Sequence, residues 1–134
     1  MPVPFEFVVD GPVVSQQARS KERREAWQQD VQDAARDRWD AEPPEAGPVS
    51  VTITYFFNRV DVDVDNIPKP ILDALEGLIF SDDAQVSDLL CRKRDFRDLP
   101  VVRNPPADLQ DYLRESRQVV HIHVDHARNR EVTF

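Results

Sequence analysis

Closely spaced carboxylates in the middle of the chain are the residues best suited to chemistry. Asp61, Asp63 and Asp65 occupy alternate positions, and Asp82 and Asp83 follow farther along. On an extended backbone alternate side chains point the same way, so Asp63 and Asp65 would face a common point about 7 Å apart along the chain. The valines between them would then point into the core. Clustered carboxylate oxygens suit Mg²⁺ or Mn²⁺, which prefer octahedral oxygen ligation. The segment therefore favours a divalent-cation site.

A site of this kind suits hydrolysis of a phosphodiester. One cation, or a pair about 4 Å apart, can lower the pKa of an attacking water and stabilise the leaving oxygen. Lys69 stands where it could offset charge on the phosphate or help to orient the water. Acidic residues near a helix N-terminus also occur simply because they complement the helix dipole. The carboxylates alone therefore leave both interpretations open.

The elements expected to hold these residues follow from hydrophobic periodicity. Alternating apolar residues predict strands, a 3.6-residue apolar period predicts helices, and the proline-rich residues 42–48 predict a loop. The expected strands are residues 5–9, 49–57, 85–92 and 118–124, and the expected helices are residues 20–39, 68–76 and 107–114. This order predicts one α+β domain over residues 1–134, a single-layer mixed β-sheet of about four strands packed with two to three helices.

Composition and charge fit a globular chain with an unusual concentration of acid. Of 134 residues, 40% are hydrophobic and 31% are charged, and the net charge is −8. Residues 61–88 hold eight acids against one base, Lys69, so most of the net charge lies there, where a bound cation would offset it. No apolar run approaches the ~18 residues of a membrane helix. The single Cys91 cannot form an internal disulfide, which suggests a reducing cytoplasm.

Two motifs in this region resemble those of the RusA family of phage-type Holliday junction resolvases. The first, D-x-D-N-x-x-K-x-x-x-D-x-L, is DVDNIPKPILDAL at residues 63–75, and the second is DDAQV at residues 82–86. The combined spacing is far more specific than a lone pair of aspartates. The resemblance implies a homodimeric, Mg²⁺-dependent endonuclease, with Mn²⁺ as a possible substitute, that cuts paired strands of branched DNA at four-way junctions.

The resemblance also implies roles for individual residues. Asp63, Asp65 and Asp83 match the family's metal-binding aspartates, and Lys69 matches its essential lysine. The acids expected to have secondary roles are Asp61, Asp73 and Asp82. The residues expected to contact DNA are Arg59, Arg92, Lys93 and Arg94.

Other interpretations stay open beside this one. A catalytically weak or inactive relative would keep the fold and use its acidic surface to bind a basic protein or a nucleic acid. The pattern HIHVDH at residues 121–126 has the spacing of a zinc motif, although a strand with one wetter face explains it more simply. Phe56, Phe57 and residues 78–80 offer apolar material for a dimer interface, and burial in the monomer core explains them almost as well.

Overall fold

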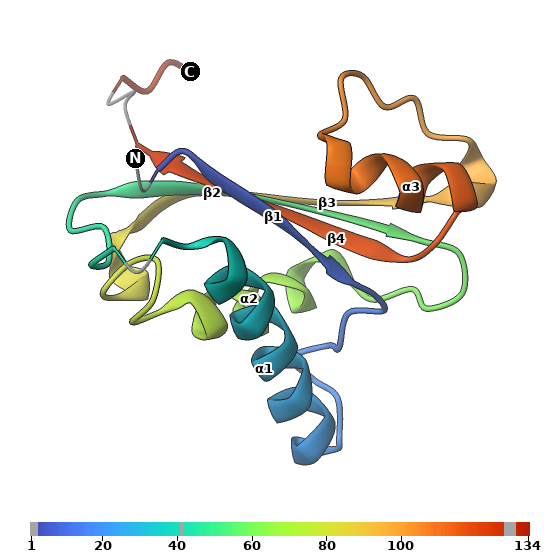
Figure 1. Cartoon of the computed structure of the whole chain (residues 1–134), viewed down its shortest axis with the longest axis horizontal. Coiled ribbons are helices and arrows are strands. Elements are labelled where there is room, and N and C mark those ends of the chain that lie inside the picture. The colour runs from blue at the N-terminus through green and yellow to red at the C-terminus, as the bar shows by residue number, and fades with distance from the viewer. Residues whose placement is uncertain (1–2, 41, 128–130) are drawn as a thin grey trace.

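The computed structural model describes residues 3–40, 42–127 and 131–134, and it is built on one four-stranded sheet (Figure 1). The strands are β1 (Phe5–Asp10), β2 (Val49–Phe57), β3 (Val86–Asp95) and β4 (Val119–His126), and the helices are α1 (Lys21–Arg38), α2 (Pro68–Leu75) and α3 (Ala107–Glu115). The sheet order is β1-β4-β2-β3, in which β2 and β3 are parallel and β4 is antiparallel to both of its neighbours. The predicted α+β class, with a mixed sheet of four strands, is thereby confirmed.

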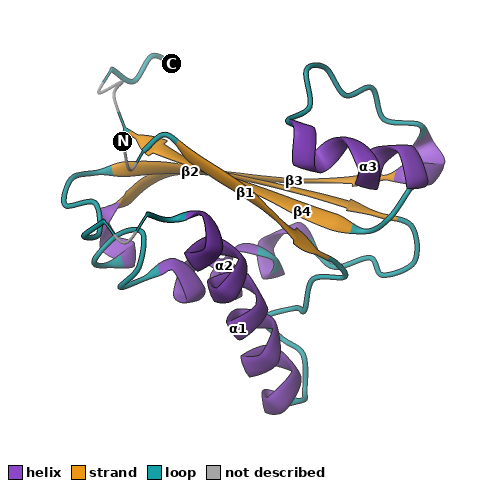
Figure 2. Cartoon of the chain, in the orientation of Figure 1, coloured by secondary structure: helices purple, strands orange, loops and turns teal. Residues whose placement is uncertain are grey.

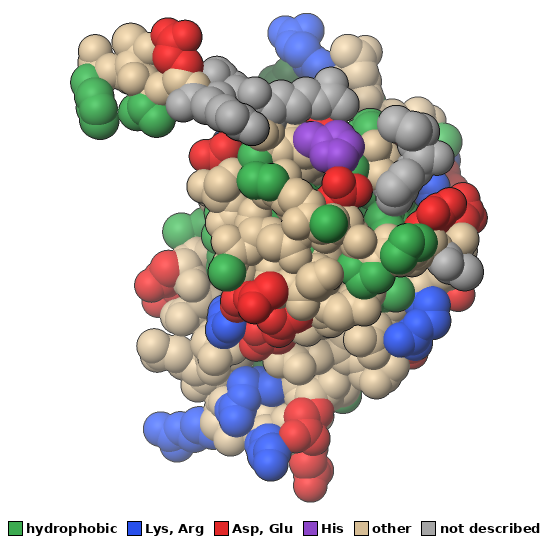
Figure 3. All heavy atoms as spheres, turned by 90° about the vertical axis from the view of Figure 1, so that its left-hand side faces the viewer, with side chains coloured by type: hydrophobic (Ala, Val, Ile, Leu, Met, Phe, Trp, Pro, Cys, Tyr) green, Lys and Arg blue, Asp and Glu red, His purple; other side chains and the backbone are tan. Residues whose placement is uncertain are grey.

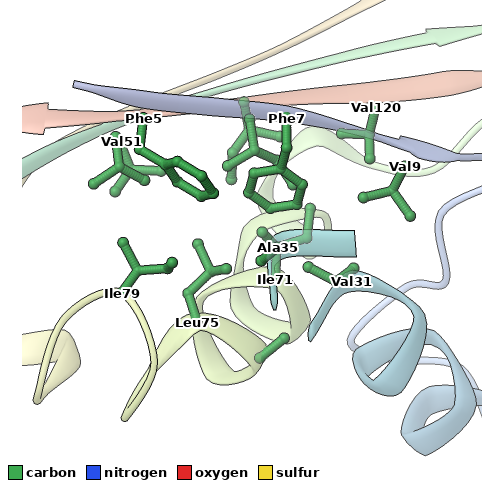
Figure 4. Close-up of a cluster of buried hydrophobic side chains, with 14 of the residues drawn as sticks. Phe5, Phe7, Val9, Val31, Ala35, Val51, Ile71, Leu75, Ile79 and Val120 are labelled. Atoms are coloured by element: carbon green, nitrogen blue, oxygen red, sulfur yellow. The ribbon is translucent and has the colours of Figure 1, made fainter. Parts of the chain in front are cut away.

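Helices cover the two faces of the sheet unequally. α1 and α2 pack together against one face, while α3 alone lies over part of the other (Figure 2). Side chains of the sheet meet Val31 and Ala35 of α1 and Ile71 and Leu75 of α2 in the main core, where all four helix residues are fully buried (Figure 4). The candidate acids near α2 therefore lie on the side of the sheet that carries this core.

The face under α3 has its own small core, formed by Phe56, Leu109 and Val119. Because successive strand residues point to opposite faces, Phe56 joins this cluster while Phe57 joins the main core. Phe56, Phe57 and the pair Ile79-Phe80 are at most 4% exposed. The apolar residues that the sequence offered as a dimer interface thus belong mainly to the monomer core.

The first residues of α1 and α2 agree with local sequence signals, whereas two strands are longer than predicted. Ser20 caps α1, because its hydroxyl accepts a hydrogen bond from the backbone N–H of Arg23 at 3.2 Å. α2 begins at Pro68, whose missing N–H costs little in a first turn. β3 and β4 run farther than predicted, to Asp95 and His126, because each pairs with β2 along nearly its whole length. No helix in the described ranges is both long and apolar enough to cross a membrane.

Candidate active site

The segment between β2 and α2 carries the first group of candidate acids, and hydrogen bonds fix its beginning. The Tyr55 hydroxyl donates to the carbonyl of Val60 at 2.8 Å, and burial raises the pKa of this phenol to about 12. The side-chain oxygen of Gln118 accepts from the backbone N–H groups of Arg59 and Val60 at 3.0 and 2.9 Å. These bonds set the path of the chain where it leaves β2, immediately before Asp61.

The backbone that follows is not extended, which corrects the sequence-based expectation. Val64–Asn66 form a single 3-10 turn, η1, that packs against β3 and α2. A helical turn has no alternation of side chains, so the alternating arrangement predicted for Asp63 and Asp65 is absent. Both aspartates are exposed. The valines differ too, since Val62 packs against the core whereas Val64 is exposed.

Lys69, in the first turn of α2, links the two acidic motifs. Its Nζ lies 2.9 Å from Oδ1 of Asp73, one helical turn away, and 3.2 Å from Oδ2 of Asp83. Hydrogen bonds to Asp73 and to Asp83 raise the pKa of Lys69, and the hydrogen bond from Lys69 is the main cause that lowers the pKa of Asp83. Both Lys69 and Asp83 are therefore charged at neutral pH.

The loop that carries the second acidic pair is fastened by the side chain of Gln85. Its oxygen accepts from the backbone N–H groups of Ser81 and Asp82 at 2.8 and 2.9 Å. Its nitrogen donates to the carbonyls of Glu45 and Gly47 at 2.7 and 2.9 Å. Asp82 and Gln85 together form a capping box at the beginning of a second 3-10 turn. One amide group thus joins the acidic loop to the loop that precedes β2.

Three carboxylates converge at this loop, those of Glu76, Asp82 and Asp83. One oxygen of each lies within 4.8 Å of the others, and Oε1 of Glu76 accepts from the backbone N–H of Asp83 at 3.2 Å. Acidic side chains gather beside a cationic one near the middle of the face drawn in Figure 3. Hard oxygen donors at this separation fit Mg²⁺ or Mn²⁺, which bind through one or two carboxylates and keep several waters. In the described part of the chain, no other three potential ligands come this close.

Membership of this cluster differs from the predicted ligand set. Asp83 is common to both, whereas Asp63 and Asp65 lie outside the three-carboxylate group. Glu76 was not expected in the site. Its spacing of seven residues from Lys69, which places the two on one helix face, was the signal that could have identified it.

The fold and these contacts have a counterpart among known families. Residues 12–103, well over half of the chain, match the family described as Endodeoxyribonuclease RusA. The chain belongs to the RusA family. The matched stretch contains β2, α2, β3 and all the acids of the candidate site, and the family is one of endonucleases that resolve Holliday junctions. Comparison with curated proteins finds no match.

The basic residues predicted to contact DNA in this RusA-family chain do not form one patch. Lys93 lies on the main-core side of β3, where its Nζ is 2.6 Å from Oδ1 of Asp61. Arg92 and Arg94 point to the α3 side, because residues alternate along the strand. Arg59 lines a separate cavity of about 540 Å³ near the ends of β1 and α3. Only Lys93 therefore shares a face of the sheet with the acids.

The histidines of β4 lie outside the cluster of close potential metal ligands in this RusA-family structure. Nε2 of His121 lies 2.8 Å from Oε2 of Glu6, and Nδ1 of His126 lies 3.4 Å from Oε1 of Glu45. Among the described residues, no group of three close potential ligands includes a histidine. The buried residues that alternate with them are Val120, Ile122 and Val124. The simpler interpretation, a strand with one wetter face, accounts for the pattern.

Proposed function

We propose that this protein is a Mg²⁺-dependent, structure-selective endodeoxyribonuclease that resolves Holliday junctions in DNA recombination and repair. The observation that carries the proposal is the contact between Lys69 and Asp83 beside the carboxylates of Glu76 and Asp82. An ammonium group next to hard oxygen ligands suits a phosphodiester, whose hydrolysis needs both charge stabilisation and an activated water. Membership of the RusA family supports the same activity.

The proposed metal ligands are Asp63, Asp65 and Asp83, with Mn²⁺ as a substitute for Mg²⁺. Glu76 and Asp82 are the competing partners of Asp83, because their oxygens lie within 4.8 Å of it. When bound, a divalent cation would activate water for attack and offset charge on the leaving oxygen. The two ligand sets share Asp83, so they are distinguished only by substitutions at the other positions.

The chain's own side chains have distinct tasks in this proposal. Lys69 keeps its proton because Asp73 and Asp83 raise its pKa, so it brings a positive charge to a phosphate bound beside the acids. Asp83 stays ionised because Lys69 lowers its pKa. Asp73 acts through Lys69, and Gln85 acts through the backbone of the loop that carries Asp83, so both are positioning residues.

Cleavage of a panel of labelled four-way junctions, forks, flaps and linear duplexes, with and without Mg²⁺, tests this function. We expect junctions to be cut only when the cation is present, and Asp83→Asn to abolish cutting while the fold is retained. Asp37→Asn, on the exposed surface of α1, removes the same charge away from the site and should cut at the wild-type rate. Wild-type rates in Asp83→Asn, or cutting in excess chelator, would contradict the proposal.

We also propose a two-fold symmetric homodimer. Resolution of a junction needs two symmetry-related cuts, and each chain carries one set of acids. The edge strand β3 supports this assembly, because Leu89 and Leu90 are 45% and 51% exposed in adjacent positions. An edge strand with exposed apolar side chains and unpaired backbone groups favours pairing with a second copy.

A second candidate function is that of a catalytically weak or inactive RusA-family protein that binds a protein or nucleic-acid partner. The net charge of −8 favours it, because an acidic surface repels DNA phosphates and attracts a basic partner. Binding of junctions without cutting, in the presence of Mg²⁺ or Mn²⁺, would favour this candidate over the nuclease.

A further inference from the structure

A cavity of about 540 Å³ opens on the α3 face of the sheet, away from the acids. Thr54 and Phe56 of β2 line it, together with Arg92 and Arg94 of β3 and Arg103 of the loop before α3. A smaller cavity of about 130 Å³ shares Arg92 and Arg103 and reaches α3. The sheet, the loop and α3 therefore enclose one concave surface with three arginines on it, here called the arginine pocket.

The charge of the arginine pocket is not neutralised by nearby acids. Nε of Arg92 donates to the hydroxyl of Thr54 at 2.9 Å, and Nη1 of Arg94 donates to the carbonyl of Lys93 at 2.9 Å. Neither these two nor Arg103 forms an ion pair with any carboxylate that the structure describes. Most guanidinium donors of the pocket are thus available to an anion, in a chain whose net charge is −8.

The chemistry of the pocket favours phosphate as its ligand. A guanidinium group presents a planar fork of donors that matches phosphate oxygens in pairs. The phenyl ring at the pocket, Phe56, is only 4% exposed, and the imidazole of His121 is held by Glu6 at 2.8 Å. Neither ring is an open platform on which a base could stack. Arginines without an exposed aromatic partner suit a nucleic-acid backbone better than its bases.

The arginine pocket and the cluster of Glu76, Asp82 and Asp83 lie on opposite faces of the sheet. They also lie near opposite ends of β3. The strand begins next to the loop of Asp83 and reaches the pocket at Arg94. At about 3.3 Å per residue, Val86 and Arg94 are roughly 26 Å apart. DNA has a persistence length of about 50 nm, so a linear duplex is effectively straight over this distance. A duplex seated at Glu76, Asp82 and Asp83 would have to bend round the sheet to reach the pocket, and this bending costs free energy.

Two DNA arms that diverge from a branch point can contact the acids and the arginine pocket at the same time. We propose that the arginine pocket binds backbone phosphates of a second DNA arm, one that this subunit does not cut, and thereby selects branched over linear DNA. This inference rests on the proposed nuclease function. It assigns the selection step to Arg92, Arg94 and Arg103, on the face of the sheet that carries none of the catalytic acids.

Binding measured in a chelator, where no strand is cut, tests the proposal with the full chain. A labelled four-way junction and a linear duplex of equal total length are titrated at several salt concentrations. Arg94→Gln/Arg103→Gln removes two charges and keeps Arg92, which is bonded to Thr54. We expect the preference for junction over duplex to fall about tenfold. The slope of log K against log salt for the junction should become shallower by about one to two, since each phosphate contact contributes about 0.9.

A matched control separates the pocket from the effect of net charge. Arg19→Gln/Arg23→Gln removes the same number of charges from two exposed positions, one just before α1 and one in its first turn. We expect this control to keep the preference for junctions. An equal loss of preference in both double variants would overturn the proposal, because general electrostatics would then explain it.

Inorganic phosphate is the second probe, because a free phosphate compound shares the chemistry of a DNA backbone. Saturable phosphate binding that Arg94→Gln/Arg103→Gln abolishes, with junction preference retained, would overturn the second-arm proposal in favour of a small ligand. A wild-type protein that cuts junctions with Mg²⁺, and whose preference survives the double variant, would overturn this inference alone. A wild-type protein that cuts no DNA would instead overturn the proposed function.

Discussion

Lys69 lies between Asp73 and Asp83, and this position determines how the site responds to pH. Asp83 has a lowered pKa, so its contribution to stability is present above the ordinary value of 3.8 and is lost as the pH falls through the lowered value. Lys69 has a raised pKa, so its contribution is present below 10.5 and is lost as the pH rises through the raised value. The pair therefore stabilises the fold between these limits.

We expect the free energy of unfolding of Lys69→Met to lie below that of the wild type at pH 7, and the difference to shrink in acid once Asp83 is protonated. Urea denaturation in a chelator across this pH range measures it. Lys21→Met, which removes an exposed ion pair with Glu25, is the control and should show a weaker pH dependence. The prediction would be contradicted if the free energies of unfolding of Lys69→Met and the wild type differed as much at pH 2 as at pH 7.

The ligand set of the metal site is testable through thermal stability. A cation that binds only the folded state stabilises it, by about 2.7 kcal/mol at a hundredfold excess over Kd. We expect millimolar Mg²⁺ or Mn²⁺ to raise the Tm of the chelator-treated protein, and Asp65→Asn to blunt the rise. Glu76→Gln is the informative comparison. A blunted rise in Glu76→Gln with a full rise in Asp65→Asn would assign the metal to the cluster of Glu76, Asp82 and Asp83.

The contact between Lys69 and Asp83 agrees with the two sequence motifs, which implied that these residues act together. Their roles in catalysis stay predictions. The inference for Asp63 and Asp65 depended on an extended backbone, and the 3-10 turn at Val64–Asn66 removes that premise. The spacing of Glu76 from Lys69 indicated a shared helix face, but the approach of Glu76 to Asp82 and Asp83 is a tertiary contact that this spacing does not predict.

Among the elements, the loop fastened by Gln85 is the one on which the site depends most directly. Gln85→Ala removes four hydrogen bonds to the backbone, each worth about 0.5–1.5 kcal/mol net. We expect it to lower the free energy of unfolding by about 2–4 kcal/mol and to reduce cleavage further, by loosening Asp83. Urea denaturation and single-turnover cleavage measure the two effects.

The matched control for Gln85→Ala is Gln110→Ala, which removes one hydrogen bond from an exposed glutamine to the carbonyl of Pro105. Gln110→Ala should leave both the free energy of unfolding and the rate of cleavage nearly unchanged. If Gln85→Ala is as harmless as Gln110→Ala, the loop is held by other contacts and the positioning role of Gln85 is wrong.

Strands and helices were predictable because their signals are local. Apolar residues at every second position along β2, and Trp27, Val31 and Ala35 along α1, record which side of each element is buried. The order β1-β4-β2-β3 and the parallel pairing of β2 with β3 were not predictable in the same way. They depend on contacts between segments far apart in the chain, which periodicity does not report.

For the whole molecule, the proposed dimer gives a direct prediction. Leu90→Asp places a charge in the exposed apolar pair of the edge strand, so we expect it to shift the molecule toward the monomer mass of 15.5 kDa. Light scattering over a dilution series measures this. Leu99→Asp, which changes a still more exposed leucine outside the strand, should leave the mass unchanged. A wild-type protein that is monomeric at every concentration, even with junction DNA bound, would exclude paired cutting by a dimer.

The sequence predicts where the acidic residues gather but not where the arginines gather. The concentration of acid within residues 61–88 is evident from the sequence. The separation of Lys93 from Arg92 and Arg94 follows from strand alternation, although the sequence alone did not show that a pocket would form around the two arginines. That pocket needs α3 and the loop before it, whose packing over the sheet is a tertiary event.

The central position of β4 has a consequence for how the protein is made. β1 leaves the ribosome before the other elements that the structure describes, yet among them its partner in the sheet is β4, formed by Val119–His126. At about 5–20 residues per second, the nascent chain carries Phe5 and Phe7 without their strand neighbours until Val119–His126 have emerged. Exposed apolar side chains of this kind favour aggregation over that interval. Because β4 lies between β1 and β2, the four-stranded sheet beneath the candidate site cannot be complete before Val119–His126 have emerged.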